Sequence, residues 1–205
     1  RIEELEKQFG KLDWRVALNV GLEVAQEKFC KFKNKLEAME VGIRVGLAYL
    51  SNGIVSSPLE GFTNLKIKKR RDGKEYFALM FSGPIRSAGT TITCGSILVA
   101  DYIRKNMGYD IYDPTENEIK RIIVEVYDYH ERITNLQYLP SEIEVDNMIR
   151  NLPVQIDGEP SEDFDVSNYK DLDRIETNKL RGGVCLVTGE ALCQKAPKFW
   201  NKISK

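Results

Sequence analysis

The sequence predicts an α+β fold with N-terminal helices, a small mixed sheet including a basic β-hairpin, and helices packed on the sheet. Two observations lead to this prediction. Apolar residues recur at helical spacing through residues 1–52 and again through 115–133. Between these regions, residues 64–81 form two strand-like runs around Asp72-Gly73. With 205 residues, 42% of them hydrophobic, the chain is long enough for a substantial core.

Residues 1–52 are predicted to form a helical N-terminal extension. Val16, Val20 and Val24 recur at helical spacing, and Asn52-Gly53 is a typical helix-ending signal. Residues 53–205 are predicted to form an α+β domain, either beside the extension or as one unit with it.

Residues 64–81 predict the β-hairpin, because Asp72-Gly73 is typical of a two-residue type I′ turn. Its arms carry the densest basic cluster of the chain: Lys66, Lys68, Lys69, Arg70, Arg71 and Lys74. One interpretation is contact with phosphates. The alternative is an exposed hairpin whose charges discourage edge-to-edge strand pairing.

The segment that follows, residues 75–107, reads as a buried strand, a GPIRSAG turn and a helix. A helix N-terminus with small residues before it can hold an anion, and Arg86 adds a forked donor. Ser87, Gly89 and Thr90 complete this candidate site. The turn matches neither the Walker nor the Rossmann fingerprint, so it predicts an anion site without a reaction.

Two further helices are predicted from signals at their starts. The first begins either with a capping box of Thr115 and Glu118 or with Asp113 as the cap and Pro114 in the first turn, and the second begins with a capping box of Ser141 and Glu144. His130 falls on the apolar stripe of the first of these helices, which favours a hydrogen-bonded core histidine over a catalytic one. The later segment NLPVQIDGEP predicts a short strand.

A second Arg/Gly turn, Arg181-Gly182-Gly183, precedes another apolar segment. The two turns are candidates to converge on one anion. Equally, their glycines allow backbones to pack closely. The residue types alone leave both interpretations open.

Charge is unevenly distributed along the chain, although the net charge is only −1. Residues 61–110 carry nine basic and four acidic groups, residues 111–176 six and seventeen, and residues 177–205 six and one. A local basic face favours nucleic-acid contact. The alternative is that the acidic segment neutralises the basic ones within the fold.

Other features exclude several classes of protein. No apolar run reaches the roughly 18 residues of a membrane helix. The cysteines, Cys30, Cys94, Cys185 and Cys193, lack zinc-ligand spacing, so we expect buried, reduced thiols and no metal.

Five blocks occur in order along the chain: LSNGIVSSPLEG, FSGPIRSAGTT, LQYLPSEIEV, RNLPVQIDGEP and ETNKLRGGVCLV. Together they resemble the N-terminal region of the large subunit of archaeal DNA polymerase D, the family D replicative polymerase, over about residues 48–196. One position departs from the family pattern, because Thr90 stands where the family usually has a second glycine. Any close backbone approach made by that glycine would be altered here.

The resemblance implies a non-catalytic domain that contributes to DNA binding and to subunit and domain assembly in replication. In the family, the catalytic aspartates and zinc-binding cysteines lie further downstream. The resemblance implies that no cofactor binds in this region and that the parent nucleotidyltransferase uses Mg²⁺. It also implies a location in the archaeal cytoplasm, with no membrane partner.

The implied partners are primer–template DNA, the small exonuclease subunit, the remaining domains of the large subunit and, through self-association, a second copy. An alternative is a purely structural assembly or dimerisation domain. A self-contained phosphate-handling enzyme is disfavoured because no Walker lysine and no nucleophile–base pair is present.

Overall fold

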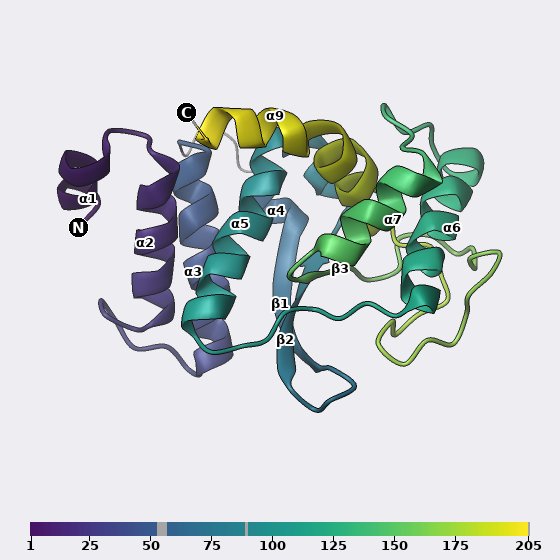
Figure 1. Cartoon of the computed structure of the whole chain (residues 1–205), viewed down its shortest axis with the longest axis horizontal. Helices are drawn as coiled ribbons and strands as arrows, with labels where there is room; N and C mark the ends of the chain where they lie inside the picture. The colour runs from purple at the N-terminus through teal and green to yellow at the C-terminus, as the bar shows by residue number, and fades with distance from the viewer. Residues whose placement is uncertain (53–56, 89, 205) are drawn as a thin grey trace.

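A computed structural model describes residues 1–52, 57–88 and 90–204 (Figure 1). The helices are α1 (Ile2–Phe9), α2 (Trp14–Ala25), α3 (Lys35–Leu50), α4 (Ser57–Gly61), α5 (Thr90–Asn106), α6 (Glu116–Arg132), α7 (Glu142–Asn151), α8 (Gly182–Leu186) and α9 (Gln194–Ile203). The strands are β1 (Phe62–Lys69), β2 (Glu75–Phe81) and β3 (Gln155–Asp157). A 3₁₀ segment, η1 (Gly83–Ala88), precedes α5, and a π-helical segment, η2 (Val187–Cys193), joins α8 to α9.

The sheet has the order β1-β2-β3, with β1 antiparallel and β3 parallel to the central β2. Leu79 of β2 lies opposite Leu65 on one side and Ile156 on the other. Six of the seven residues of β2 are buried, because the strand is covered on both faces. This mixed sheet with surrounding helices confirms the predicted α+β class.

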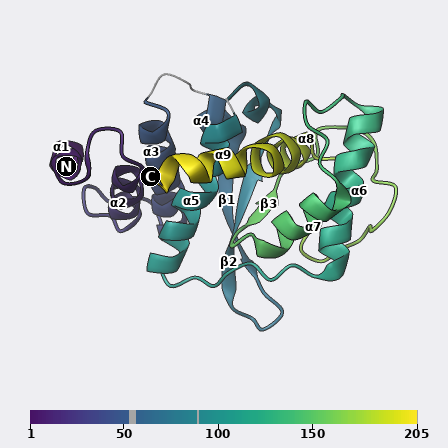
Figure 2. The same ribbon diagram turned by 45° about the horizontal axis from the view of Figure 1, so that its top comes forward.

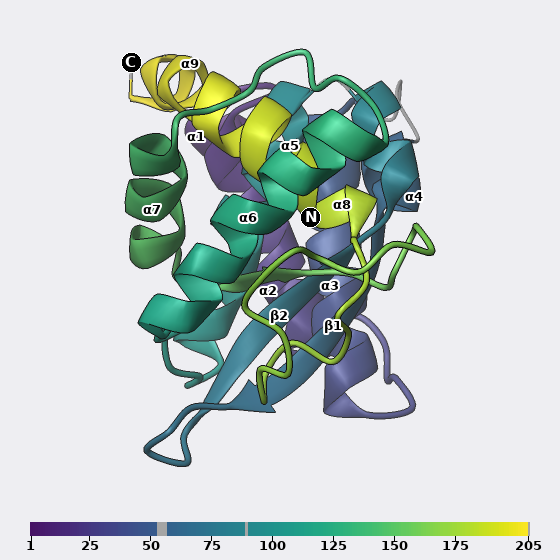
Figure 3. The ribbon, with the colours of Figure 1, turned by 90° about the vertical axis from the view of Figure 1, so that its right-hand side faces the viewer.

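Helices cover both faces of the sheet (Figures 1 and 3). On one side α3 contacts β1 and α5 contacts β2, and on the other α8 contacts β2 and β3. Leu18 of α2 and Leu47 of α3 belong to the same buried core as Leu79 of β2 and Ile119 of α6. The N-terminal helices α2 and α3 are therefore packed into the main core.

The local signals for α6 and α7 are confirmed in detail. Both capping boxes are present, with Thr115 and Ser141 as the N-caps. His130 is hydrogen-bonded as predicted, because its Nδ1 atom accepts the Leu136 N–H at 2.9 Å, but it is half-buried and does not belong to the core.

The turn between β1 and β2 differs from the predicted type I′ turn. Gly73 donates its N–H to the Arg70 carbonyl oxygen at 3.0 Å, and Arg70 donates to the Lys74 carbonyl oxygen at 2.8 Å. Gly73 has a φ of +85°, whereas Asp72 does not adopt a positive φ. A type I′ turn needs positive φ at both central residues, so this connection is a three-residue loop closed by a left-handed glycine.

The structure also bears on the expectations about membrane helices and cysteines. None of the described helices combines the length and apolarity needed to cross a bilayer. Cys94 and Cys185 are buried as predicted. Cys30, in the loop between α2 and α3, is exposed, and Cys193 is only half-buried. Both correct the expectation that all four cysteines are buried.

Candidate nucleic-acid interface

Arg86, in the first Arg/Gly turn, is held by acceptors from two other segments. Its Nη2 atom donates to the Asn135 carbonyl oxygen at 3.0 Å and to Oε1 of Glu190 at 3.1 Å. Glu190 is only 1% exposed, and the same Oε1 atom accepts the Gln137 N–H at 2.7 Å. Arg86 therefore joins η1 to the loop after α6 and to η2.

The other candidate residues of this turn lie wholly or partly outside the described residues. Gly89 lies outside the described residues, and so do the side chains of Ser87 and Thr90. The backbone of Thr90 begins α5. An anion site at the start of α5 therefore stays a prediction, while Arg86 already has a buried carboxylate as its partner.

Arg181, in the second turn, is completely buried. Its Nη2 atom lies 2.6 Å from Oε2 of Glu125, and its Nη1 atom 2.6 Å from Oδ1 of Asp157. Burial by itself would lower the pKa of Arg181, but the two carboxylates raise it above its ordinary value, so the guanidinium stays charged. Without exposed surface, Arg181 has a structural role here, which corrects its prediction as a phosphate contact.

The glycines of the second turn allow close backbone packing. A Cβ atom on Gly183 would lie 2.3 Å from the Phe81 carbonyl oxygen, and one on Gly182 2.8 Å from Oγ of Ser161. Phe81 ends β2 just before η1, and α8 contacts η1. The two Arg/Gly turns are thus neighbours, and backbone packing is what brings them together.

The inner half of the β1–β2 hairpin is neutralised by carboxylates. Nζ of Lys66 lies 2.7 Å from Oε2 of Glu176, and Nζ of Lys68 lies 2.7 Å from Oδ2 of Asp157. The side chain of Lys68 is only 10% exposed. These carboxylates come from β3 and from the acidic segment that follows it, which runs across β1 (Figure 3). Of the two interpretations of the charge pattern, nucleic-acid contact or neutralisation within the fold, these two lysines show neutralisation.

The tip of the hairpin is different, because its cations are exposed. The side chains of Arg71 and Lys74 are 69% and 60% exposed, with carboxylates of Asp113 and Asp110 at 3.5 and 3.4 Å. Exposed pairs of this kind contribute little, since water and salt screen them. Lys69 is exposed and has no ion pair within the described part of the chain. The tip projects beyond the helices (Figures 1 and 3).

A groove of about 390 Å³ lies beside this tip. Its lining comes from the hairpin, the start of α6 and the segment before α8: Lys69, Arg70, Arg71, Thr115, Asn117, Glu118, Asp171, Leu172, Asp173 and Arg174. Arg174 is fixed by Glu118, with Nη2 2.6 Å from Oε2. The Nε atom of Arg70 is buried without a hydrogen bond among the described residues, but it lies 3.3 Å from Oδ1 of Asp72 in an ion pair. The groove therefore combines exposed cations with several carboxylates.

A buried ionic network joins α6 to β3 and to Arg181, and it was not predicted from the sequence. Arg121 and Glu125, on the inner face of α6, are both completely buried and lie 3.3 Å apart, and Glu125 also binds Arg181. A signal was present, because Glu118, Arg121 and Glu125 recur at helical spacing beside the apolar stripe. Within residues 1–52, 57–88 and 90–204, no group of His, Cys, Asp or Glu side chains is arranged to hold a metal ion.

Comparison with known proteins identifies the family. The family model described as DNA polymerase II large subunit DP2, N-terminal, matches residues 1–205. The DNA polymerase II large subunit of Nanoarchaeum equitans is 47% identical over 100% of this chain and 16% of its own length. Those of Methanosarcina barkeri and Thermoplasma acidophilum are 41% and 46% identical, over 100% and 88% of this chain. The chain spans 16–18% of the length of these relatives. It belongs to the family of N-terminal regions of archaeal DNA polymerase II large subunits.

Proposed function

We propose that this is the non-catalytic N-terminal domain of a family D replicative polymerase and that its hairpin tip contacts the phosphates of primer–template DNA. The observation that carries the proposal is the exposure of Lys69, Arg71 and Lys74 on a projecting loop beside a groove. Catalysis, with its Mg²⁺, would belong to the rest of the large subunit.

The cations of this domain differ in how readily they can exchange a carboxylate for a phosphate. A phosphate gains little by competing for Lys68 or Arg181, because their carboxylates are buried with them. The weak pairs of Arg71 and Lys74 are easily replaced, and Lys69 has no described partner to lose. Phosphate contacts of this kind position a protein on DNA without reading its sequence.

A salt titration on primer–template DNA tests the proposal, using the intact polymerase with its small exonuclease subunit. The variant Lys69→Ala/Arg71→Ala/Lys74→Ala removes the exposed charges of the tip. The slope of log K against log salt should become shallower by about three, roughly one for each phosphate that the tip no longer neutralises. Affinity should fall by a similar factor for unrelated DNA sequences.

The matched control is Lys28→Ala/Lys31→Ala/Lys33→Ala, in the loop between α2 and α3. It removes the same charge from exposed side chains, two of which have equally loose partners, at 3.8 and 3.6 Å. This variant should keep the wild-type slope. If both variants weaken DNA binding equally, the loss comes from the change in overall charge, and a specific contact by the tip is refuted.

The alternative function is an assembly domain that does not touch DNA. The inward partners of Arg86 and Arg181 favour it, since both arginines serve packing within the domain. If the tip variant binds DNA with wild-type affinity and slope, this alternative replaces the DNA contact.

A further inference from the structure

We propose that an apolar groove between α5, α7 and α9 is the docking site for the part of the same large subunit that follows this domain. The groove has a volume of about 500 Å³. Its walls include Leu98 of α5, Met148 and Leu152 at the end of α7, and Pro197, Trp200 and Ile203 of α9. This proposal does not depend on DNA contact by the hairpin.

The chemistry of the groove points to an apolar protein segment. Asp101 is the single charged side chain among its described lining residues, so no cation is present there to bind a phosphate. Trp200 is 65% exposed. A large indole is seldom left so exposed next to an apolar groove, and such patches mark surfaces that another protein segment covers.

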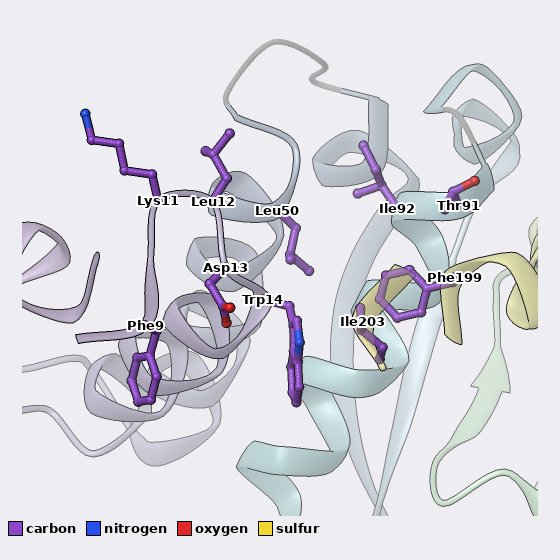
Figure 4. Close-up of a pocket in the computed structure, with 10 residues that line it drawn as sticks. All are labelled: Phe9, Lys11, Leu12, Asp13, Trp14, Leu50, Thr91, Ile92, Phe199 and Ile203. Carbon is purple, nitrogen blue, oxygen red and sulfur yellow. The ribbon is translucent and has the colours of Figure 1, made fainter. Parts of the chain in front are cut away.

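A second hollow also borders α9. This hollow, of about 270 Å³, is lined by Phe199 and Ile203 of α9 together with Trp14 of α2 and Leu50 of α3. Figure 4 shows these four side chains around one space. The lining of this second hollow is mixed, because it also includes Lys11 and Asp13. The helix α9 therefore separates an apolar groove from a mixed hollow, and a segment running along the helix would cover both.

The occupant that we infer for the groove is the downstream part of the same subunit. The family is an N-terminal region, and more than four-fifths of each relative lies outside the matched part. In such a subunit the chain leaves this domain through α9, which forms one wall of the groove. A segment tethered there has a high effective concentration, whereas a second copy or another subunit must bind from solution.

The groove is also far from the hairpin tip. In Figures 1 and 3 α9 lies at one end of the molecule and the tip of the hairpin at the other, and in Figure 2, where α9 comes forward, the tip still lies well below it. Docking and DNA binding can therefore be measured separately.

Hydroxyl-radical footprinting of the intact polymerase tests the proposal without any substitution. Phe29 and Phe164 are each 52% exposed in this domain and serve as references for Trp200. After correction for intrinsic reactivity, Trp200 should be oxidised several-fold more slowly than both, although its exposed fraction here is larger. Oxidation of Trp200 at the rate of the references would overturn the proposal.

Photo-crosslinking identifies the occupant. A photoreactive phenylalanine at Met148, inside the groove, should crosslink within the large subunit to residues downstream of this domain. The matched control is Ile143, which lies on the same helix, is 73% exposed and does not line the groove. Crosslinks from Met148 to the small subunit or to a second copy, or none at all, would refute the proposal, as would equal downstream crosslinking from Ile143.

Discussion

The Arg/Gly turn at residues 181–183 and the tip of the β1–β2 hairpin have similar residue types and opposite environments. Both have an arginine within two residues of a glycine in a basic stretch of sequence. Arg181 is fully buried against Glu125 and Asp157, whereas the side chain of Arg71 is 69% exposed with a single loose partner. The difference shows that the position of the carboxylates, more than the presence of arginine, decides which cations are available to a ligand.

The physical reason is the dielectric environment. A charge pair in the interior is poorly screened, so removing one partner leaves the other buried and unpaired. A pair in water is weak and exchanges readily with another anion. The buried turn should therefore affect stability, and the exposed tip should affect binding.

The largest effect is expected for Arg181→Ala. It takes one cationic partner from each of the buried carboxylates Glu125 and Asp157, which keep only Arg121 and Lys68. The free energy of unfolding should fall by about 3–5 kcal/mol, because a buried charge network loses a fully buried member. Urea unfolding of the 205-residue domain measures this decrease. The matched change Arg71→Ala should stay within about 0.5 kcal/mol of wild type. If the Arg181→Ala domain keeps its stability and loses only DNA affinity, the buried turn contributes to binding and the expected difference between turn and tip is wrong.

A smaller effect is expected for Gly183→Ala, which tests backbone packing at the same turn. Its Cβ would lie 2.3 Å from the Phe81 carbonyl oxygen, so β2 or α8 must shift, at a cost of about 1–3 kcal/mol. The control is Gly83→Ala in the other Arg/Gly turn, where a Cβ meets no heavy atom within 4 Å. Thermal unfolding should separate the two variants, and equal melting temperatures would contradict the packing role.

The smallest effect is expected for Glu176→Gln, which removes a carboxylate that masks Lys66 and Lys68. The hydrogen bond from Lys66 lowers the pKa of Glu176 below its ordinary 4.5, so the pair stabilises the fold above that pH. This contribution disappears as the pH falls through the lowered pKa. At pH 7 the variant should be less stable by about 0.2–1 kcal/mol, because Glu176 is largely exposed.

The Glu176→Gln variant also tests whether this carboxylate masks the hairpin lysines from DNA. It unmasks Lys66, so affinity for DNA at low salt should rise rather than fall. Unchanged unfolding between wild type and variant at pH 7, together with unchanged DNA affinity, would show that the acidic segment masks nothing.

Local sequence signals predicted much of the fold. The Thr115/Glu118 and Ser141/Glu144 capping boxes placed the starts of α6 and α7, because such signals depend on neighbouring residues alone. The turn of the hairpin was placed correctly at Asp72-Gly73, but its type was not, since Gly73 alone takes the left-handed conformation.

The candidate site was harder to predict. Arg181 and Arg71 are both arginines beside turn residues, and no local pattern separates them. What separates them is Glu125, which is 56 residues from Arg181 in sequence and 2.6 Å away in space. Long-range contacts of this kind are not encoded in any window of sequence.

By itself, the sequence determined the helical and strand periodicity, the capped helix starts, the basic and acidic segments, and the resemblance to a polymerase subunit. Only the tertiary structure decided which charges cancel. It brings the acidic segment against Lys66 and Lys68, buries Arg181 with Glu125, and leaves Lys69 and Arg71 in water. The reason is that the energy of a charge depends on its distance from other charges and from solvent, and folding sets both.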